Sequence, residues 1–310
     1  MDMKVNLGGL EMASPVAAAS GTFGYGTEYL GAADYSKIGA VTAKGVRLDP
    51  WPGNAMPRHC EVPGGLVNAI GLQGAGVEKF LSMSVPWYAS NSSVPMIVNI
   101  WGGSVEEYAE VAKRISAAAS SGGPCSVIKA VECNVSCPNV KEGGHAFGQD
   151  VATLARLVSE VRKATGLVLI VKLPPNVPSV APYAKACEDE GADAISLINT
   201  IPAMVIDIER RRPVLGNVTG GLSGRCVHPV AVKAVYDAHR ATKLPLLAMG
   251  GVATAADAVE FMLAGATAVA VGTAAFTDPG VFASVHDGIA EYCERHGFAS
   301  AASLTGALEQ

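Results

Sequence analysis

Cys137 is the side chain of this sequence whose type and setting most directly suggest chemistry. It lies in the segment ECNVSCPNVKEGG (residues 132–144), between the end of an apolar run and a loop whose Gly143 and Gly144 permit movement. A thiol has a reference pKa of about 8.5, so a modest lowering of that pKa makes it a competent general base near neutrality. Because a single cysteine is more often an inert buried side chain, this interpretation depends on the residues around it.

Polar side chains close most of the short apolar segments of the sequence, which is where a barrel of parallel strands collects its functional groups. Asparagine offers both a donor and an acceptor, and lysine offers charge, so together they could bind a planar heterocycle with amide and carboxylate edges. A solvated side chain at the rim explains each residue alone equally well, but the size of the set favours a binding site. The set comprises Ser20, Lys44, Asn99, Asn134, Lys172 and Asn199.

Two later segments, AMGGVAT and AVGTAAF, end in glycines instead. Gly250-Gly251 and Gly272-Thr273 each lead into a helical stretch, and glycine lets backbone N–H groups approach a phosphate. A tight turn that needs glycine for its backbone angles explains either pair equally well, whereas two pairs on consecutive strands favour a phosphate site. Because no G-x-G-x-x-G opens a helix with an acidic residue about twenty positions later, we expect a mononucleotide such as FMN rather than NAD.

Eight strand-like segments alternate with helical intervals, which predicts a closed (β/α)₈ TIM barrel. A chain of 310 residues is long enough to form such a barrel as one FMN-binding domain over residues 1–310. The helical intervals have lengths that suit right-handed crossovers and cover residues 104–119, 150–164, 179–190, 229–241 and 254–264. The predicted strands are residues 16–20, 40–44, 96–100, 127–134, 167–173, 194–199, 245–250 and 268–272.

Three further segments complete the expected architecture. Residues 3–12, with Gly8-Gly9 at the turn, predict a β-hairpin that closes the bottom of the barrel. Residues 45–73 and 200–228 are rich in Gly, Pro and Arg. We expect two long loops there that cover the active site, because loops of this length inside a compact domain are usually functional.

Composition and charge argue against several classes of protein. The 23 Lys and Arg and 28 Asp and Glu residues give a net charge of −5 without a basic stripe, so no nucleic-acid partner is expected. No apolar run is long enough to cross a membrane, and the N-terminus does not resemble a signal peptide, so we expect a cytoplasmic protein. Seven cysteines without a secreted spacing or a second set of ligands predict free thiols and no metal site in this chain.

The sequence resembles the class 1 dihydroorotate dehydrogenases along nearly its whole length. The form CNVSCPNVKEGG is most similar to the NAD-linked class 1B catalytic subunit, an FMN-dependent barrel enzyme that oxidises dihydroorotate to orotate in de novo pyrimidine (UMP) biosynthesis. The segments that carry the resemblance are ASGTFGYG (19–26), Lys44 with PWPGNAMPR (50–58), VNAIGLQ (67–73), NVSCPN (134–139), VKLPPN (171–176), INT (198–200), GGLSG (220–224), MGGV (249–252) and VGTA (271–274).

The resemblance implies a role for each matching position. Cys137 would be the base that removes a proton from C5 of dihydroorotate while hydride leaves C6 for the flavin, and Lys44 would contact both flavin and substrate. A cation at Lys172 would stabilise the negative charge that arrives with the hydride. Substrate contacts are implied for Lys44, Asn68, Ala69, Ile70, Gly71, Leu72, Asn134, Asn199 and Thr200. FMN contacts are implied for Ser20, Lys44, Asn99, Asn134, Lys172, Ile198 and Gly224, with Gly250, Gly251, Gly272 and Thr273 around the phosphate.

The resemblance also implies a partner. The family's NAD-linked members pass electrons to NAD through a second subunit that carries FAD and a 2Fe-2S cluster, and two catalytic subunits form a homodimer within a heterotetramer. The alternatives in the same fold are a fumarate-linked dihydroorotate dehydrogenase and an FMN barrel of the dihydropyrimidine dehydrogenase type. More remote alternatives are an aldolase-type barrel with Lys44 or Lys172 as Schiff-base nucleophile, and a catalytically silent barrel that serves only in assembly.

Overall fold

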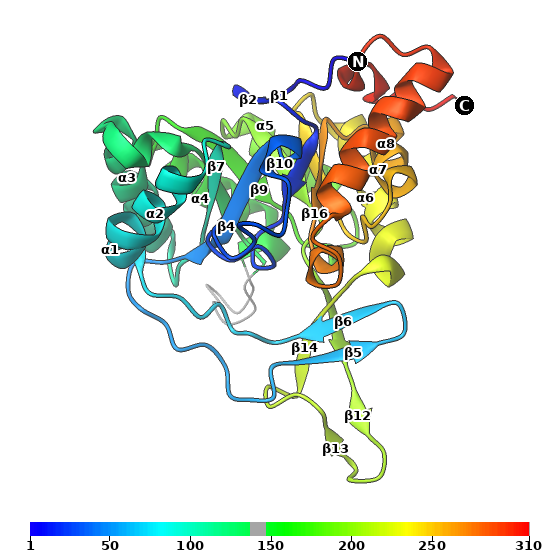
Figure 1. The fold of residues 1–310 in the computed structure, drawn as a ribbon. Helices are drawn as coiled ribbons and strands as arrows, with labels where there is room; N and C mark the ends of the chain where they lie inside the picture. Colours follow the sequence, from blue (N-terminus) through cyan, green and yellow to red (C-terminus); the bar gives the residue numbers. More distant parts are fainter. Residues whose placement is uncertain (137–146, 310) are drawn as a thin grey trace.

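Eight parallel strands close into a barrel in the computed structural model of the chain, which describes residues 1–136 and 147–309 (Figure 1). Each strand of the barrel pairs with the next one along the chain, and the last pairs with the first to complete the ring. The eight predicted strands and the closed TIM barrel are therefore confirmed. In order around the ring, the strands are β3 (Val16–Ala18), β4 (Ala40–Val46), β7 (Met96–Ile100), β8 (Ile128–Asn134), β9 (Val168–Lys172), β10 (Ala194–Leu197), β15 (Leu246–Met249) and β16 (Ala268–Val271).

Amphipathic helices cover the outside of the barrel (Figure 1). In α3 (Val105–Ser120) the buried residues recur every three or four positions, so that one face of the helix packs inward. Side-chain hydrogen bonds cap the N-termini of α3, α4 (Val151–Ala164) and α7 (Ala255–Leu263), and in α7 Thr254 and Asp257 form a reciprocal capping box. All five predicted helical intervals are helical. The other helices are α1 (Val77–Lys79), α2 (Val85–Asn91), α5 (Ala181–Asp189), α6 (His228–Ala241) and α8 (Val281–His296).

Side chains inside the barrel change from apolar to polar toward the C-terminal ends of the strands. Every second residue of a strand faces the interior, because successive side chains point to opposite faces. The C-terminal end is also where barrels of this type carry their active sites. The apolar layer lies nearer the N-terminal ends of the strands, and we refer to it as the lower layer. It consists of Ala17, Ala40, Ile97, Ala130, Ile170, Ala194, Leu247 and Ala268. Two residues further along five of these strands lie the buried polar side chains of Thr42, Asn99, Glu132, Lys172 and Ser196.

A β-hairpin closes the N-terminal end of the barrel, as predicted. Strands β1 (Val5–Leu7) and β2 (Leu10–Met12) are antiparallel, and their alternate apolar residues are buried in one cluster with the lower barrel layer. Gly8 occupies the turn with a φ of 63°, and a Cβ there would lie 2.2 Å from the backbone oxygen of Asp193, directly before β10. Glycine is therefore required for the hairpin to approach the strand ends so closely.

The two long loops predicted at residues 45–73 and 200–228 carry a small antiparallel sheet. It lies at the opposite end of the barrel from the β1–β2 hairpin, so its predicted place over the active face is confirmed (Figure 1). The sheet order is β11 (Ile201–Met204), β14 (Thr219–Ser223), β6 (Gly65–Asn68) and β5 (His59–Val62), and a separate hairpin of β12 (Ile206–Asp207) and β13 (Arg212–Pro213) projects beyond it. The strands within these loops were not predicted. β5–β6 and β11–β14 are local pairs, but β6 pairs with β14 across about 150 residues of sequence, which local patterns do not reveal.

The glycines that disguised β14 are required by its close packing. A Cβ at Gly221 would lie 2.0 Å from the hydroxyl oxygen of Thr200, and a Cβ at Gly220 would lie 2.5 Å from the backbone oxygen of Asn68. Glycine inside a strand often marks such a close approach of another chain segment. The same sequence feature that suggested a loop therefore permits the sheet.

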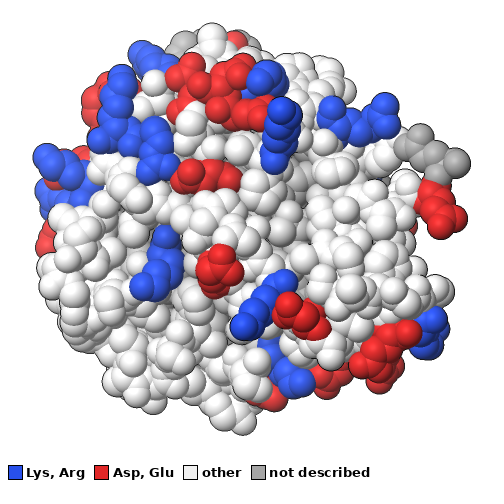
Figure 2. All heavy atoms as spheres, turned by 90° about the horizontal axis from the view of Figure 1, so that it is seen from above, with Lys and Arg blue, Asp and Glu red and all other residues white. Residues whose placement is uncertain are grey.

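Acidic and basic side chains are interspersed on the face of the molecule seen in Figure 2. Some pair within one helix, as Lys185 and Asp189 do in α5, and Lys233 and Asp237 in α6. Exposed pairs of this kind contribute little stability each, so the helices are held mainly by their apolar faces. Among the described residues, every helix is too short or too polar to span a bilayer, and the cysteines are free thiols.

Candidate active site

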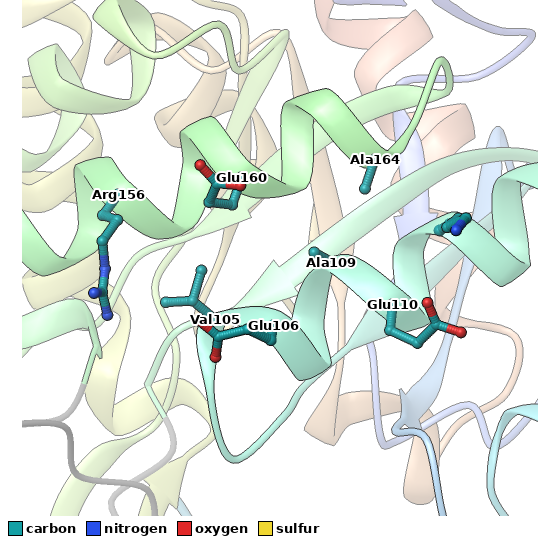
Figure 3. Close-up of a pocket in the computed structure, with 8 residues that line it drawn as sticks. Val105, Glu106, Ala109, Glu110, Arg156, Glu160 and Ala164 are labelled. Atoms are coloured by element: carbon teal, nitrogen blue, oxygen red, sulfur yellow. The ribbon is translucent and has the colours of Figure 1, made fainter.

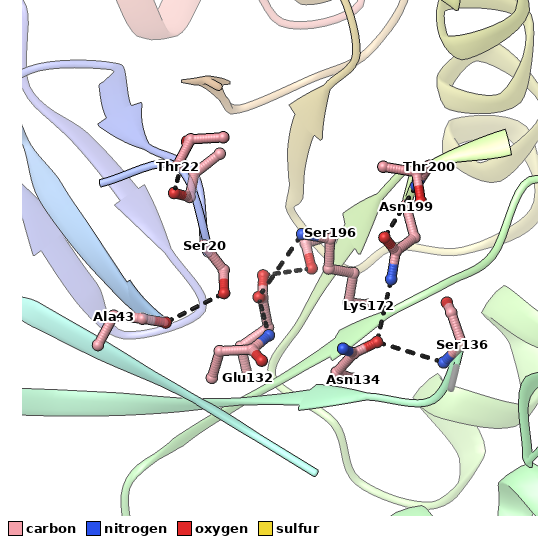
Figure 4. Close-up of polar contacts among 12 residues, drawn as sticks. Ser20, Thr22, Ala43, Glu132, Asn134, Ser136, Lys172, Ser196, Asn199 and Thr200 are labelled. Carbon is pink, nitrogen blue, oxygen red and sulfur yellow. Dashed lines mark hydrogen bonds and ion pairs between the residues drawn. The ribbon is translucent and has the colours of Figure 1, made fainter. Parts of the chain in front are cut away.

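The predicted amides meet at the C-terminal mouth of the barrel (Figure 4). Asn134 ends β8 and Asn199 follows β10, two strands away. The side-chain amide of Asn199 donates to Oδ1 of Asn134 at 3.0 Å, and the backbone N–H of Ser136 donates to the same oxygen at 3.3 Å. Asn199 Oδ1 accepts the backbone N–H of Thr200 at 2.8 Å. Both amides are therefore fixed in orientation, and Nδ2 of Asn134 keeps its donors free of any described residue.

A buried carboxylate that the sequence reasoning missed lies beneath these amides. Glu132 precedes Asn134 by two residues in β8, so both face the interior, and it is fully shielded from solvent. Its Oε1 accepts a hydrogen bond from the amide of Asn99 at 2.6 Å, and its Oε2 accepts one from the hydroxyl of Ser196 at 2.7 Å. The ammonium of Lys172 lies 3.9 Å from Oε1 (Figure 4). The spacing of two residues from Asn134 is the signal that could have predicted Glu132.

Lys44 is half-buried near the end of β4, and its ammonium has no hydrogen bond or ion pair with a described residue. Burial lowers the pKa of Lys44, and the guanidinium of Arg58 lowers it further, against a smaller opposing effect of Glu28. A lysine in this setting can neutralise an anionic ligand. As a neutral amine it can also act as a nucleophile, which is the chemistry of the aldolase alternative.

The predicted substrate loop, residues 68–72, is held by two side chains that the sequence reasoning did not single out. The amide of Asn54 donates to the backbone oxygen of Ala69 at 3.0 Å, and the backbone N–H of Asn54 donates to that of Ile70 at 3.1 Å. Arg58 donates to the backbone oxygen of Asn54 at 2.6 Å, and its own backbone oxygen accepts the N–H of Ala69 at 2.7 Å. Asn54 and Arg58 therefore fix the backbone of this loop.

The same loop lies close to the other predicted residues. The side-chain amide of Asn68 donates to the backbone oxygen of Gly221 at 3.3 Å, and Gly221 packs against Thr200. Gly45 lies between Leu72 and Asn99, since a Cβ there would lie 3.6 Å from Cδ2 of Leu72, an ordinary contact, and a tight 3.1 Å from Oδ1 of Asn99. The structure thus brings the loop over the interior polar layer.

The two glycine pairs converge with Gly224 on the other side of the ring. β15 and β16 are neighbours, so Gly250-Gly251 and Gly272-Thr273 follow adjacent strand ends. The hydroxyl of Thr273 donates to that of Ser223 at 2.9 Å, and a Cβ at Gly251 would lie 2.9 Å from the backbone oxygen of Gly224. In an eight-stranded ring β16 is opposite β8, so a ligand that contacts both the amides and these glycines must span the barrel mouth.

The glycines of this cluster differ in what requires them. Gly224, Gly250 and Gly251 have positive φ values of 102°, 128° and 82°, so the turn geometry alone accounts for them. Gly272 has a φ of −117°, and a Cβ there would meet nothing nearer than 3.6 Å. Neither the φ value nor packing against Ala19 and Thr22 requires glycine at position 272, so Gly272 is the member of the cluster for which the close approach of a phosphate remains as an explanation.

Ser20 and Ile198 lie at the same rim. The hydroxyl of Ser20 donates to the backbone oxygen of Ala43 at 3.0 Å, which places Ser20 beside the residue before Lys44. The backbone N–H of Ile198 donates to Met249 at 3.0 Å, and its side chain lies 3.4 Å from the position of a Cβ at Gly250. Both residues are thus adjacent to other members of the predicted set.

The predicted base, Cys137, lies outside the described residues. Cys133 is four residues earlier in β8, and its side chain points outward into the core between barrel and helices. Burial raises the pKa of the Cys133 thiol, so it is not a competent base near neutrality. Of the two cysteines in this segment, only Cys137 remains a candidate for proton transfer.

A groove of about 440 Å³ lies elsewhere, on the outside of the barrel between α3 and α4 (Figure 3). Glu106, Glu110 and Glu160 border it, with Ala109 and Ala164 between them. None of the predicted site residues lines this groove, so it is separate from the site at the strand ends.

Comparison with known proteins gives one consistent family. The family model described as dihydroorotate dehydrogenase matches residues 2–293. Three relatives carry the name "Dihydroorotate dehydrogenase B (NAD(+)), catalytic subunit". The protein from Pelobacter propionicus is 50% identical over 308 residues, which is 99% of both chains. Those from a Geobacter species and Parabacteroides distasonis are 50% and 46% identical over 308 residues, which is 99% of this chain and 98% of each relative.

These matches run over the full barrel and its active-site segments rather than over one motif. They confirm the resemblance drawn from the sequence, including its class 1B character. The chain therefore belongs to the dihydroorotate dehydrogenase family.

Proposed function

We propose that this chain is the catalytic subunit of an NAD-linked dihydroorotate dehydrogenase, which oxidises dihydroorotate to orotate in pyrimidine biosynthesis. The main structural support is the pair of amides, Asn134 and Asn199, fixed at the barrel mouth above the buried Lys172 and Glu132. A pyrimidine ring presents alternating C=O and N–H groups, which amides match in both roles. The carboxylate of the substrate suits the cation of Lys44, which has no ion-pair partner among the described residues. Family membership supports the same substrate.

FMN is the proposed cofactor of this site, and when bound it would accept the hydride. Three features fit it: the glycine at position 272, which neither its φ value nor packing requires, the ammonium of Lys172, and the buried hydroxyl of Thr42, which has no hydrogen-bond partner among the described residues. The residues proposed to hold it are Ser20, Lys44, Asn99, Asn134, Lys172, Ile198 and Gly224, with Gly250, Gly251, Gly272 and Thr273 at the phosphate.

The chain's own residues supply the rest of the chemistry. Cys137 takes the proton from C5 of dihydroorotate. Lys172 would stabilise the negative charge that a bound flavin gains with the hydride. The substrate loop from Asn68 to Leu72 holds the pyrimidine together with Asn199 and Thr200, and it shields the reacting atoms from water. Because Asn54 and Arg58 hold the loop backbone, the substrate binds to groups that are already oriented.

A second subunit that carries FAD and a 2Fe-2S cluster completes the proposed enzyme. It would take electrons from the catalytic subunit and reduce NAD, and two catalytic subunits would form a homodimer within a cytoplasmic heterotetramer. The names of the relatives, which describe catalytic subunits, support a separate partner. Residues 1–310 would act as one FMN-binding domain, because the last barrel strand pairs with the first.

An anaerobic visible spectrum of the purified chain, recorded before and after addition of dihydroorotate, tests the proposal directly. We expect flavin bands that dihydroorotate bleaches. Bands that persist would assign the site to another pyrimidine. A colourless chain that takes up no FMN would contradict the proposal, and borohydride trapping of a substrate on Lys44 would then support the aldolase alternative.

The electron acceptor is tested separately with the reduced chain. We expect neither NAD nor fumarate to reoxidise the isolated chain rapidly, and we expect NAD reduction once the electron-transfer subunit is added. Fast NAD reduction by the isolated chain would contradict the role of the partner, and fast fumarate reduction would assign the chain to the fumarate-linked type.

A further inference from the structure

Glu132 is the acidic side chain that is most completely buried among the described residues, with an exposed fraction of 0%. It is in the middle of β8, one interior layer below the amides of the barrel mouth. An ionised carboxylate in such a place costs several kcal/mol unless it is paired and hydrogen-bonded. A buried acid that the proposed reaction does not use therefore needs a physical explanation.

The neighbours of Glu132 are arranged around an ionised carboxylate. Each of its oxygens accepts one hydrogen bond from a neutral donor, from Asn99 at 2.6 Å and from Ser196 at 2.7 Å. Lys172 supplies the positive charge, but at 3.9 Å from Oε1 its ammonium is too far for a hydrogen bond. The lysine is thus electrostatically paired with Glu132 while its N–H groups stay available to a ligand.

Glu132 also fixes how Asn99 faces the site. Because the amide nitrogen of Asn99 donates to Glu132, its carbonyl oxygen must point elsewhere. That oxygen lies on the side of β4, 3.1 Å from the position of a Cβ at Gly45. Asn99 therefore presents an acceptor toward the strand that carries Lys44 and Thr42.

We propose that Glu132 is a positioning residue that sets the charge beneath the flavin. Its negative charge offsets the positive charge of Lys172, so the bound flavin experiences a paired cation instead of an isolated one. An isolated cation would stabilise the reduced flavin more strongly and would hold back electrons that the partner subunit must receive. This inference rests on the proposed function, because it assumes that FMN occupies the barrel mouth.

The midpoint potential of bound FMN is the measurement that tests this role, and it does not depend on turnover. Glu132→Gln keeps the size of the side chain and removes the charge. We expect the ratio of reduced to oxidised flavin at a fixed potential to rise at least tenfold, which is a positive shift of about 30 mV for a two-electron couple. Ser196→Ala is the matched control, since it removes one hydrogen bond and leaves the carboxylate, and we expect a shift below threefold.

A double-mutant cycle keeps the test decisive where Glu132→Gln alone does not fold. We expect Lys172→Met to lower the same ratio at least tenfold, and the double variant Glu132→Gln/Lys172→Met to return within threefold of the unmodified chain. Replacing both partners of a buried ion pair is usually tolerated better than removing one.

Two results would overturn the proposal. One is a Glu132→Gln variant that binds FMN with an unchanged or more negative potential. The other is a double variant that shifts as far as Lys172→Met alone, because Glu132 would then have no effect of its own. Failure of the unmodified chain to bind FMN is a different outcome, which contradicts the proposed function itself.

Discussion

The two ends of the barrel are built from the same strands but differ in almost every physical respect. At the N-terminal end the interior residues are small or branched apolar side chains, and the β1–β2 hairpin seals them with Val5, Leu7, Leu10 and Met12. At the C-terminal end the same strands present amides, lysines and a buried carboxylate, and a sheet from distant segments covers them. The N-terminal end contributes stability and holds none of the proposed site residues. It therefore allows the C-terminal end to hold buried polar groups, which lower stability.

This comparison predicts that substitutions at the two ends separate catalysis from stability. Outside the buried pair of Glu132 and Lys172, changes at the C-terminal end should alter rates and affinities with little effect on unfolding, and changes at the N-terminal end should do the reverse. The following predictions test that separation.

Cys137→Ala, at the proposed general base, should have the largest effect on rate. We expect FMN binding to be retained and flavin reduction by dihydroorotate to slow by about a hundredfold or more, the usual scale for loss of a general base. Stopped-flow absorbance under anaerobic conditions measures this. Unchanged reduction kinetics would remove Cys137 from the mechanism.

Leu7→Ala at the N-terminal end of the barrel should have the largest effect on stability. Leu7 is fully buried, and removal of such a side chain costs about 2–5 kcal/mol of unfolding free energy. Leu72→Ala is the matched change at the C-terminal end, where the side chain is only partly buried, and there we expect a smaller loss of stability but weaker binding of orotate. Denaturant unfolding and orotate titration of both variants measure these effects. A larger loss of stability in Leu72→Ala, or weaker orotate binding in Leu7→Ala, would contradict the comparison.

Asn199→Ala should weaken orotate binding about tenfold, since it removes a proposed contact and leaves Oδ1 of Asn134 with one donor fewer. Asn6→Ala is the control at the N-terminal end, where the Asn6 side chain accepts a hydrogen bond from the backbone N–H of Gly9 in the hairpin turn. We expect the control to bind orotate normally. Equal losses of affinity in the two variants would show that the effect is not local to the site.

The pH dependence should show the smallest effect. Since burial and Arg58 lower the pKa of Lys44, the free chain loses this positive charge at a lower pH than an ordinary lysine. We expect the affinity for orotate to fall on the alkaline side before the ordinary lysine pKa is reached, and Lys44→Arg to move this fall to higher pH. The exposed Lys4→Arg should leave the profile unchanged.

The same lowered pKa has a defined sign for folding. Between the pKa of Lys44 in the folded chain and its higher unfolded value, the unfolded chain binds more protons. Raising the pH through that window therefore stabilises the fold. Lys44→Met should remove this contribution from a series of unfolding curves measured at alkaline pH.

The barrel and most of its site could be predicted from the sequence because both follow from local patterns. Apolar segments and amphipathic intervals define the strands and helices, and in barrels of this type the functional side chains come from the C-terminal ends of the strands. The amide and lysine set around Asn134 and Lys172 was identified in this way before any geometry was known. Glu132 lies two residues before Asn134 in the same strand, so the alternation of side chains along a strand predicts that it also faces the barrel interior.

The remaining features depend on contacts between segments that are far apart in the chain. The sequence by itself determined the eight strands of the barrel, the hairpin at Gly8-Gly9 and the polar side chains near the barrel mouth, because each depends on neighbouring residues. Only the tertiary structure decided that β14 is a strand, that Asn54 and Arg58 hold the substrate loop, and that Glu132 pairs with Asn99, Lys172 and Ser196. Those interactions join side chains from strands and loops that are far apart in the sequence, and local patterns do not specify which of these side chains come into contact.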